Sequence, residues 1–261
     1  MSEGIHPSAV IAEGATLGEG VRIGPFCVVG PEVVLGDNVR LHSHVVVDGD
    51  THVGEGTEIF PFAAIGLIPQ DLKFGGEKTA LRIGARNRIR EHVTMNLGTA
   101  GGGGLTKIGD DGLFMAGCHI AHDAIVGDRV IVVNSSAVAG HCVIEDDVII
   151  GGLCGIHQWV RIGRGAIIGA LSMVTKDVLP HGLVQGPRGE LDGLNLVGLK
   201  RAGVDRSDIT ALRAAFQMLK DGEGTFQDRA KRLGEESDSR FVQEMVGFIL
   251  GDTDRNFLTP R

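Results

Sequence analysis

The chain has 261 residues and a hydrophobic content of 43%, enough for one large domain or two smaller ones, but only 4% of its residues are aromatic and none is tyrosine. Its net charge of −8 argues against a nucleic-acid-binding surface, because neutralising phosphates requires clustered Lys and Arg. No apolar run approaches the roughly 18 residues that span a bilayer, and the N-terminus lacks the basic and apolar regions of a signal peptide, so we expect a cytoplasmic protein with no membrane span.

Aliphatic residues recur every six positions over the first two thirds of the chain. The series runs from Ile5 to Ile65, resumes from Ile83 to Met95, and runs again, with Phe114 as its one aromatic member, from Ile108 to Val174. A six-residue unit fits one short strand and a turn, and stacked units bury a continuous core that no unit could bury alone. Glycine often follows the aliphatic residue, and we interpret it as permitting backbone angles closed to other residues.

The cysteines occupy a packing position of this repeat. Each lies four positions after a repeat residue, where other units hold a small or β-branched residue. We therefore expect packing rather than disulfide or metal duty for Cys27, Cys118, Cys142 and Cys154.

Two polar or glycine-rich segments interrupt the period, at about residues 67–82 and 96–107. They are predicted to leave the scaffold as loops, which often carry function on a rigid framework. The alternative is that they are tolerated surface insertions.

The six-residue period ends after Pro180. Residues 181–195 resemble a connector, and residues 225–233 and 239–250 are predicted to be short amphipathic helices. Between the connector and the first of these two helices, a 3.6-residue spacing predicts a further helix. Ser207 or Asp208 would cap its N-terminus, and Gly222 would end it. The apolar positions of that helix are Ile209, Leu212, Ala215, Phe216 and Leu219.

The repeat resembles that of the hexapeptide-repeat acyltransferases over about residues 1–180. In that family three hexapeptides make one triangular coil of 18 residues. The resemblance implies a mainly β protein, with a left-handed parallel β-helix over residues 1–185 that contains both loops. A small C-terminal α-helical domain over residues 190–261 would follow.

Histidines cluster in the later coils. The units that begin at Ile120, Val138 and Ile156 are 18 residues apart, so three-sided coils would stack them on one face. Because adjacent strands lie about 4.8 Å apart, we expect one groove to be lined by His122, His141 and His157, with His119 beside them. Histidine is the natural general base near neutral pH. The alternative is a set of solvent-facing histidines without a function.

A narrower resemblance covers nearly the whole chain. Its motifs are similar to those of the UDP-N-acetylglucosamine O-acyltransferase family of lipid A biosynthesis, and they occur in the family's order. They are IPQDLK at 68–73, RNRIRE at 86–91, GGGLTKIG at 102–109, HIAHD at 119–123, VNSSAVAGH at 133–141, IGG at 150–152, IHQ at 156–158 and GLNLVGLKR at 193–201.

This resemblance implies transfer of an (R)-3-hydroxyacyl group from acyl carrier protein to the 3-hydroxyl of UDP-N-acetylglucosamine, the first step of lipid A biosynthesis, without a cofactor or metal. His122 would be the general base, and the Gly140 N–H would stabilise the oxyanion. Asp123 would hold the His122 ring or serve a separate role, since sequence adjacency does not establish a hydrogen bond.

The same resemblance assigns binding positions. The sugar would contact Asp71 and His141, with His119 nearby, and the acyl chain or its hydroxyl would contact Gln70 and Lys73. Ala170 matches a position that limits acyl length, and its small side chain should admit a medium-length chain. The UDP portion would be held by His157, Gln158, Asn195 and Arg201.

Three departures from the family pattern leave other acceptors open. Asn96 stands where the family often has His, Leu97 where it often has Arg, and Val197 where a Glu often contacts the nucleotide. One alternative is therefore transfer to a 3-amino UDP-sugar, which gives an amide. A second is a zinc hydratase resembling the γ-class carbonic anhydrases, with His119, His122 and His141 as ligands. A third is a non-enzymatic solenoid that serves as a scaffold.

The partners follow from the same family. Acyl carrier protein is strongly acidic, so an acidic enzyme needs a local basic docking patch. We expect it at Lys200, Arg201, Arg206 and Arg213, although Arg206 and Arg213 also fit an ordinary solvated helix face. The resemblance further implies a homotrimer with active sites between neighbouring subunits.

Overall fold

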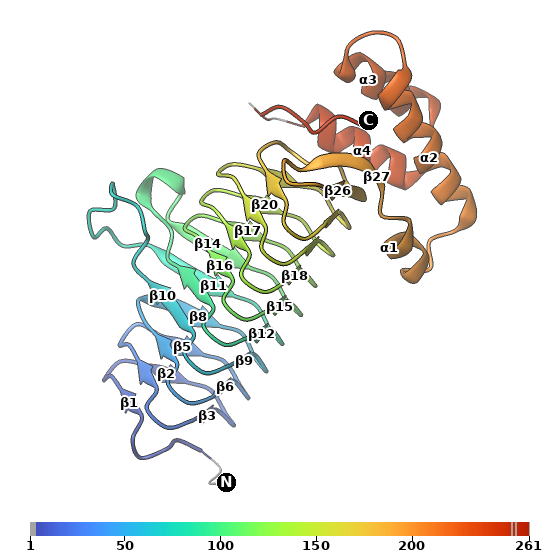
Figure 1. Ribbon diagram of the computed structural model, residues 1–261. Coiled ribbons are helices and arrows are strands. Elements are labelled where there is room, and N and C mark those ends of the chain that lie inside the picture. The colour runs from blue at the N-terminus through green and yellow to red at the C-terminus, as the bar shows by residue number, and fades with distance from the viewer. Residues whose placement is uncertain (1–3, 252, 254, 261) are drawn as a thin grey trace.

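The computed structural model describes residues 4–251, 253 and 255–260. In most repeats the strand is two residues long, and its second residue is the buried repeat aliphatic. Successive strands belong to three different sheets, so the chain returns to the same sheet after one coil. Val10 of β1 pairs in parallel with Val28 of β4, 18 residues on. The predicted parallel β-helix is confirmed, and it forms the long prism in Figure 1.

The three sheets of the described chain are the three sides of this prism. The nine-stranded sheet contains, in order, β1 (Val10–Ile11), β4 (Val28–Val29), β7 (Val46–Val47), β10 (Ala64–Leu67), β13 (Thr94–Asn96), β16 (His119–Ile120), β19 (Ala137–Val138), β22 (Gly155–Ile156) and β25 (Met173–Val174). The eight-stranded sheet contains β2 (Thr16–Leu17), β5 (Val34–Leu35), β8 (Asp50–Val53), β11 (Ala80–Ile83), β14 (Leu105–Ile108), β17 (Ile125–Val126), β20 (Val143–Ile144) and β23 (Arg161–Ile162). The ten-stranded sheet contains β3 (Arg22–Ile23), β6 (Arg40–Leu41), β9 (Glu58–Ile59), β12 (Arg88–Ile89), β15 (Leu113–Phe114), β18 (Ile131–Val132), β21 (Ile149–Ile150), β24 (Ile167–Ile168), β26 (Gly182–Gln185) and β27 (Glu190–Leu194).

The core is the row of inward aliphatic residues, and Phe114 is its largest fully buried side chain. The four cysteines are buried and free, as predicted for packing positions. Burial raises the pKa of the Cys118 and Cys142 thiols to about 12, so these thiols stay protonated and unreactive near neutral pH.

The interpretation of the repeat glycines holds at Gly66, which follows Ile65 and has a φ of 77°, but it is wrong for the other glycines that follow a repeat aliphatic. Gly24 and Gly54, which directly follow a repeat aliphatic, do not have positive φ. A Cβ on Gly54 would lie 2.4 Å from the carbonyl carbon of Gly84 in the next coil, so this glycine is needed for close approach of coils. The left-handed backbone instead occurs at the third residue after the aliphatic, as at Phe26 and His44 (φ 59° at both), where the chain turns a corner of the prism.

Both interruptions of the period project from one side of the prism as loops (Figure 1). Ala64 pairs with Thr94, 30 positions on, and Thr94 pairs with His119, 25 positions on, so the extra residues leave the stacking intact. The second loop contains a short 3-10 helix, η1 (Ala100–Gly102).

The expected connector at 181–195 is instead a hairpin, because β26 and β27 pair antiparallel on the end of the ten-stranded sheet. The helices follow as α1 (Leu196–Arg201), α2 (Arg206–Asp221), α3 (Phe226–Glu236) and α4 (Arg240–Leu250). The predicted N-caps of α2 were wrong, because Asp205 holds that position and the Asp208 carboxylate accepts a hydrogen bond from Ser239 Oγ before α4. Gly222 ends α2 as predicted.

The helices gather at the C-terminal end of the prism (Figure 1). Arg161 of β23 joins the two parts, since its guanidinium lies 4.5 Å from the centre of the Phe248 ring in α4 and 2.7 Å from an oxygen of buried Asp177. In the described part of the chain, no helix is long and apolar enough to cross a membrane.

Candidate active site

Three successive corners beside the nine-stranded sheet form the site, and the first two carry the predicted catalytic residues His122, Asp123 and Gly140. Asp123, His141 and Trp159 turn these corners with φ of 58°, 61° and 68°. Backbone hydrogen bonds stack the corners, with His141 N–H donating to the His122 carbonyl and Trp159 N–H donating to the Gly140 carbonyl, both at 3.1 Å. The repeat therefore holds His122, Gly140 and their neighbours at fixed spacing.

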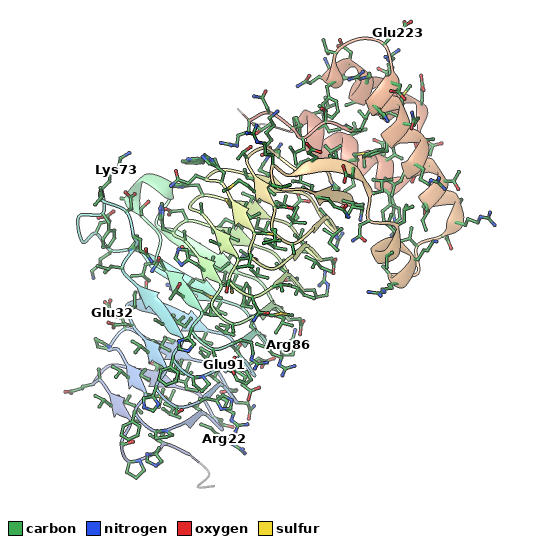
Figure 2. The ribbon with its side chains drawn as sticks, viewed as in Figure 1. Arg22, Glu32, Lys73, Arg86, Glu91 and Glu223 are labelled. Atoms are coloured by element: carbon green, nitrogen blue, oxygen red, sulfur yellow. The ribbon has the colours of Figure 1, made fainter. Side chains whose placement is uncertain are left out.

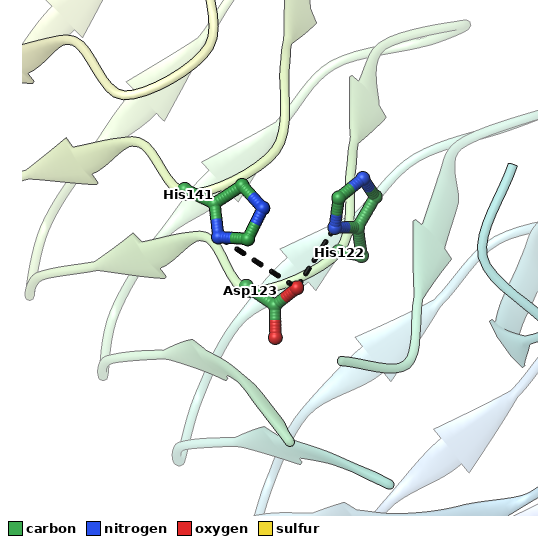
Figure 3. A group of neighbouring side chains, drawn as sticks. All are labelled: His122, Asp123 and His141. Carbon is green, nitrogen blue, oxygen red and sulfur yellow. Dashed lines mark hydrogen bonds and ion pairs between the residues drawn. The ribbon is translucent and has the colours of Figure 1, made fainter. Parts of the chain in front are cut away.

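His122 and Asp123 form a hydrogen-bonded pair at the first corner. His122 Nδ1 lies 2.8 Å from Asp123 Oδ2 (Figure 3), and both residues are buried. The same carboxylate accepts hydrogen bonds from the Thr99 hydroxyl and the Thr99 N–H, so it is an acceptor and His122 Nδ1 carries the hydrogen. His122 Nε2 is then the basic nitrogen.

Thr99 and Thr106 belong to this arrangement, and the sequence reasoning missed both. Thr106 Oγ1 accepts the Asp123 N–H at 2.8 Å and so fixes the backbone of the corner. The available signal was the placement of these two hydroxyl residues on either side of the glycine run at 101–104.

His141 does not lie in the expected row. Its ring stacks on Trp159 at 3.8 Å between centroids and meets His122 edge to face at 5.0 Å (Figure 3 shows the two histidines). Burial lowers the pKa of His141, and the charge of Asp123 opposes this shift. His141 therefore packs against His122 and is not part of the groove lining, whereas His157 lines the groove.

A groove of about 310 Å³ opens beside His122. Its polar lining comes from Gln70, His119, His122, His157 and Gln158, and its remaining lining is formed by Ala121, Ala137, Ala139, Gly140, Gly155, Ile156 and Met173. The structure thus brings five of the predicted polar site residues to one place, on a floor of small and apolar side chains.

His119 and Gly140 have distinct settings within this groove. His119 Nδ1 lies 2.7 Å from Thr94 Oγ1, and burial is the main cause of its lowered pKa, so its ring is neutral near pH 7. A Cβ on Gly140 would lie 2.5 Å from His122 Cε1, so only glycine leaves room for the ring. Among the hydrogen bonds of the described residues, none uses the Gly140 N–H.

The other predicted residues do not line the groove of the same chain. Lys73 lies on the first loop, at the side of the prism where both loops project (Figure 2), and Asp71 accepts the Lys73 N–H there at 3.0 Å. Ala170 is exposed at a later corner. The amide of Asn195 caps α1 and donates to the Gly165 carbonyl.

The predicted docking residues are all exposed, on α1 and α2. They are Lys200, Arg201, Arg206 and Arg213.

The residues that depart from the family pattern have different environments. Asn96 is buried, and its Nδ2 donates to the carbonyls of Leu67 and Ile68, so it anchors the start of the first loop. Leu97 is buried in the core cluster, whereas Val197 is exposed on α1.

Within the described chain, one group of side chains has the spacing of a metal site. It consists of His122, Asp123 and His141, whose ligand atoms lie within 4.8 Å of one another. The zinc ligands of the hydratase alternative are not brought together as a set, because His119 is not part of this group. The Asp123 carboxylate already accepts three hydrogen bonds, two from Thr99 and one from His122, which favours a hydrogen-bonded dyad.

A larger cavity of about 550 Å³ lies between the eight-stranded sheet and α4, and neither His122 nor His157 lines it. Its arginines are already paired, Arg161 with Asp177 and Arg164 with Asp146 and Asp147. The smaller groove is therefore the better candidate for chemistry.

Comparisons with known proteins agree with this choice. The chain matches a family model described as bacterial transferase hexapeptide over residues 14–49 and 141–176, and one described as UDP N-acetylglucosamine O-acyltransferase, domain 2, over residues 177–258. It is 65% identical over 202 residues to the acyl-[acyl-carrier-protein]–UDP-N-acetylglucosamine O-acyltransferase of Paracoccus denitrificans, covering 77% of each chain. It is 50% identical over 260 residues to that of Rhizobium johnstonii, covering 99% of this chain and 96% of the relative.

Solved structures show the same likeness. A crystal structure of a UDP-N-acetylglucosamine acyltransferase superposes with a TM-score of 0.95 at 41% identity, covering 98% of this chain and 99% of the other. The enzyme from Campylobacter jejuni gives a TM-score of 0.93 at 39% identity, covering 98% of this chain and all of the other.

Proposed function

This chain belongs to the family of acyl-carrier-protein-dependent UDP-N-acetylglucosamine O-acyltransferases, and from that premise we propose how its groove performs the transfer. Its fold is the family's left-handed parallel β-helix with a helical tail, and its activity is acyl transfer in lipid A biosynthesis. The observation that carries the proposal is the buried His122–Asp123 pair beside the groove.

His122 acts as the general base. An alcohol is a weak nucleophile near neutral pH, so a base within hydrogen-bond reach is the main chemical requirement. His122 Nε2 takes the proton of the sugar 3-hydroxyl as its oxygen bonds to the thioester carbonyl carbon. The tetrahedral intermediate then collapses, the carbon–sulfur bond breaks, and the sulfur leaves as the carrier-protein thiol with the proton from His122.

The Gly140 N–H stabilises the oxyanion of that intermediate. A backbone donor fixed in a corner needs no reorganisation as the charge develops. Its freedom from other hydrogen bonds among the described residues, next to the His122 ring, supports this role.

We assign the two substrates to the groove and to predicted residues outside its lining, which are Asp71, Lys73, His141 and Ala170. Asp71 and His141, with His119 nearby, contact the sugar, while Gln70 and Lys73 contact the (R)-3-hydroxyacyl chain or its hydroxyl. His157 and Gln158 hold the UDP portion, and Ala170 limits the acyl length. The small and apolar floor from Ala137 to Met173 supports acyl binding here.

A homotrimer completes the site. Asn195 and Arg201 lie on the tail, outside the groove of their own chain, so in this proposal a neighbouring subunit supplies them to the UDP portion. The exposed basic residues from Lys200 to Arg213 dock the acidic carrier protein. We assign the enzyme to the cytoplasm, which agrees with its four free cysteines.

Mass spectrometry of the products tests the proposal. The purified protein is offered a panel of 3-hydroxyacyl carrier-protein thioesters with UDP-N-acetylglucosamine or its 3-amino analogue. We expect an ester product and a preference for medium-length acyl chains. Metal chelators should leave the rate of product formation unchanged. An amide product alone would instead support the 3-amino acceptor, and zinc-dependent hydration activity without transfer would support the hydratase.

A further inference from the structure

The second loop places Thr99 directly on the catalytic pair. We propose that Thr99 is a positioning residue that fixes the Asp123 carboxylate and, through it, the His122 ring for proton abstraction. The kinetic test of this role rests on the proposed function, whereas its spectroscopic test does not.

Thr99 holds both oxygens of one carboxylate. Its N–H donates to Asp123 Oδ1 at 2.8 Å, and its hydroxyl donates to Asp123 Oδ2 at 2.6 Å. Two donors from one residue on two oxygens prevent rotation of the carboxylate about its Cβ–Cγ bond. The plane of the carboxylate therefore sets the direction of the hydrogen bond from His122 Nδ1.

The Asp123 carboxylate is too deeply buried for water to hold it in place. The Asp123 side chain is 1% exposed, so its oxygens depend on hydrogen-bond donors from the protein in place of water. Its three close donors are the Thr99 N–H, the Thr99 hydroxyl and His122 Nδ1–H. Thr99 supplies two of these three.

A second imidazole competes for the same oxygen. His141 Nδ1 lies 3.8 Å from Asp123 Oδ2, which is the oxygen that His122 uses at 2.8 Å. A carboxylate free to turn could exchange one histidine for the other. The Thr99 hydroxyl holds Oδ2 in place and thereby selects His122.

The loop is shaped to bring Thr99 to this position. A Cβ on Gly102 would lie 2.1 Å from the Asp123 carboxyl carbon, so the loop backbone rests directly on the carboxylate. Glu77 accepts the N–H of Ala100 at 3.1 Å and the N–H of Gly75 at 2.8 Å. These bonds tie the loop that carries Thr99 to the first loop.

Kinetics of Thr99 variants test the proposal. Thr99→Val keeps the backbone N–H and removes the hydroxyl, whereas Thr99→Ser keeps both donors. Thr57→Val is the matched control, because it removes a hydroxyl that donates to the Gly84 carbonyl in earlier coils, and Thr57 is also buried. We expect kcat of Thr99→Val to fall about 10- to 100-fold, the size of one hydrogen bond to a charged group, with KM changed less than about 3-fold. Thr99→Ser and Thr57→Val should keep kcat within about 3-fold of the unchanged protein.

A double variant asks whether Thr99 acts through Asp123. If it does, adding Thr99→Val to Asp123→Ala should cost nothing further, since residues that act as a unit are not additive. An unchanged kcat in Thr99→Val, or a full additional loss on the Asp123→Ala background, would overturn the proposal.

Nuclear magnetic resonance of the imidazole nitrogens gives a readout that needs no turnover. In ¹⁵N-labelled protein we expect a slowly exchanging His122 Nδ1–H signal, assigned by its absence in His122→Gln. It should weaken or shift in Thr99→Val and return in Thr99→Ser. If neither acceptor is acylated, the proposed function is wrong, but the His122 Nδ1–H signal still tests the role of Thr99. A signal that is unchanged in Thr99→Val refutes that role.

Discussion

At the residue scale, Gly140 and His122 are in such close contact that no side chain fits between them. A Cβ on Gly140 would lie 2.5 Å from His122 Cε1 and 2.7 Å from Nε2, so Gly140→Ala must displace the base or the corner. We expect kcat to fall by about 100-fold, as for other small displacements of a reacting group. The control is Gly152→Ala, whose Cβ would make only ordinary contacts at 3.4 Å. Equal activity of the two variants would show that the ring is not held against Gly140.

Two partly buried histidines predict a pH dependence of stability. The pKa of His119 and of His141 is lowered, mainly by burial, below the usual value near 6.5 that each regains on unfolding. The unfolded chain therefore takes up protons near pH 6.5 that the folded chain does not, and the free energy of unfolding falls as the pH drops through this value.

Urea titrations between pH 7.5 and 5.5 measure this effect. The variant His119→Gln/His141→Gln lacks both groups, so its free energy of unfolding should depend less steeply on pH. An identical slope in the variant and the unchanged protein would mean that neither ring contributes.

At the element scale, the second loop acts as a cover over Asp123, and two neighbouring glycines test this. A Cβ on Gly102 would overlap the Asp123 carboxylate, whereas a Cβ on Gly101 would meet nothing within 4 Å. Gly102→Ala should lower kcat strongly, and Gly101→Ala should leave it near its original value. Steady-state kinetics, with melting temperatures measured alongside, distinguish the two, and equal losses would show that the loop does not rest on the pair.

The same elements show how far sequence reasoning reached. The six-residue period predicted the inward face of the coils and put His122 and His157 near one another, because residues 18 positions apart stack in neighbouring coils, whereas Gly140 came from the family resemblance alone. It misplaced His141, since a residue one position further along a corner leaves the sheet face. It missed Thr99, because the path of an inserted loop does not follow the period and is fixed by contacts that form only in the folded chain.

The tail shows a second limit of the sequence. The sequence predicts a connector where the structure has the hairpin of β26 and β27, because a strand pair that extends a sheet beyond the repeat has no six-residue period. The cap of α2 was misplaced because Asp208 pairs with Ser239, a tertiary contact across helices.

At the scale of the whole molecule, the groove and the tail lie apart within one chain, so the proposed trimer predicts complementation. His122→Ala and Arg201→Ala should each be nearly inactive alone. In a trimer with sites between neighbours, random mixing of refolded chains would restore about a quarter of the sites, those with an intact His122 and an intact neighbouring Arg201. Activity of the mixture no greater than that of its components, or sedimentation as a monomer, would contradict a shared site.

The most direct test of the central claim is the turnover of His122→Ala with a 3-hydroxyacyl carrier protein and UDP-N-acetylglucosamine. The control is His44→Ala, which removes an exposed corner histidine on an early coil. If His122 is the general base, His122→Ala keeps its melting temperature but loses about 10²- to 10⁴-fold in kcat, while His44→Ala keeps full activity. Full activity in a folded His122→Ala protein would contradict the mechanism.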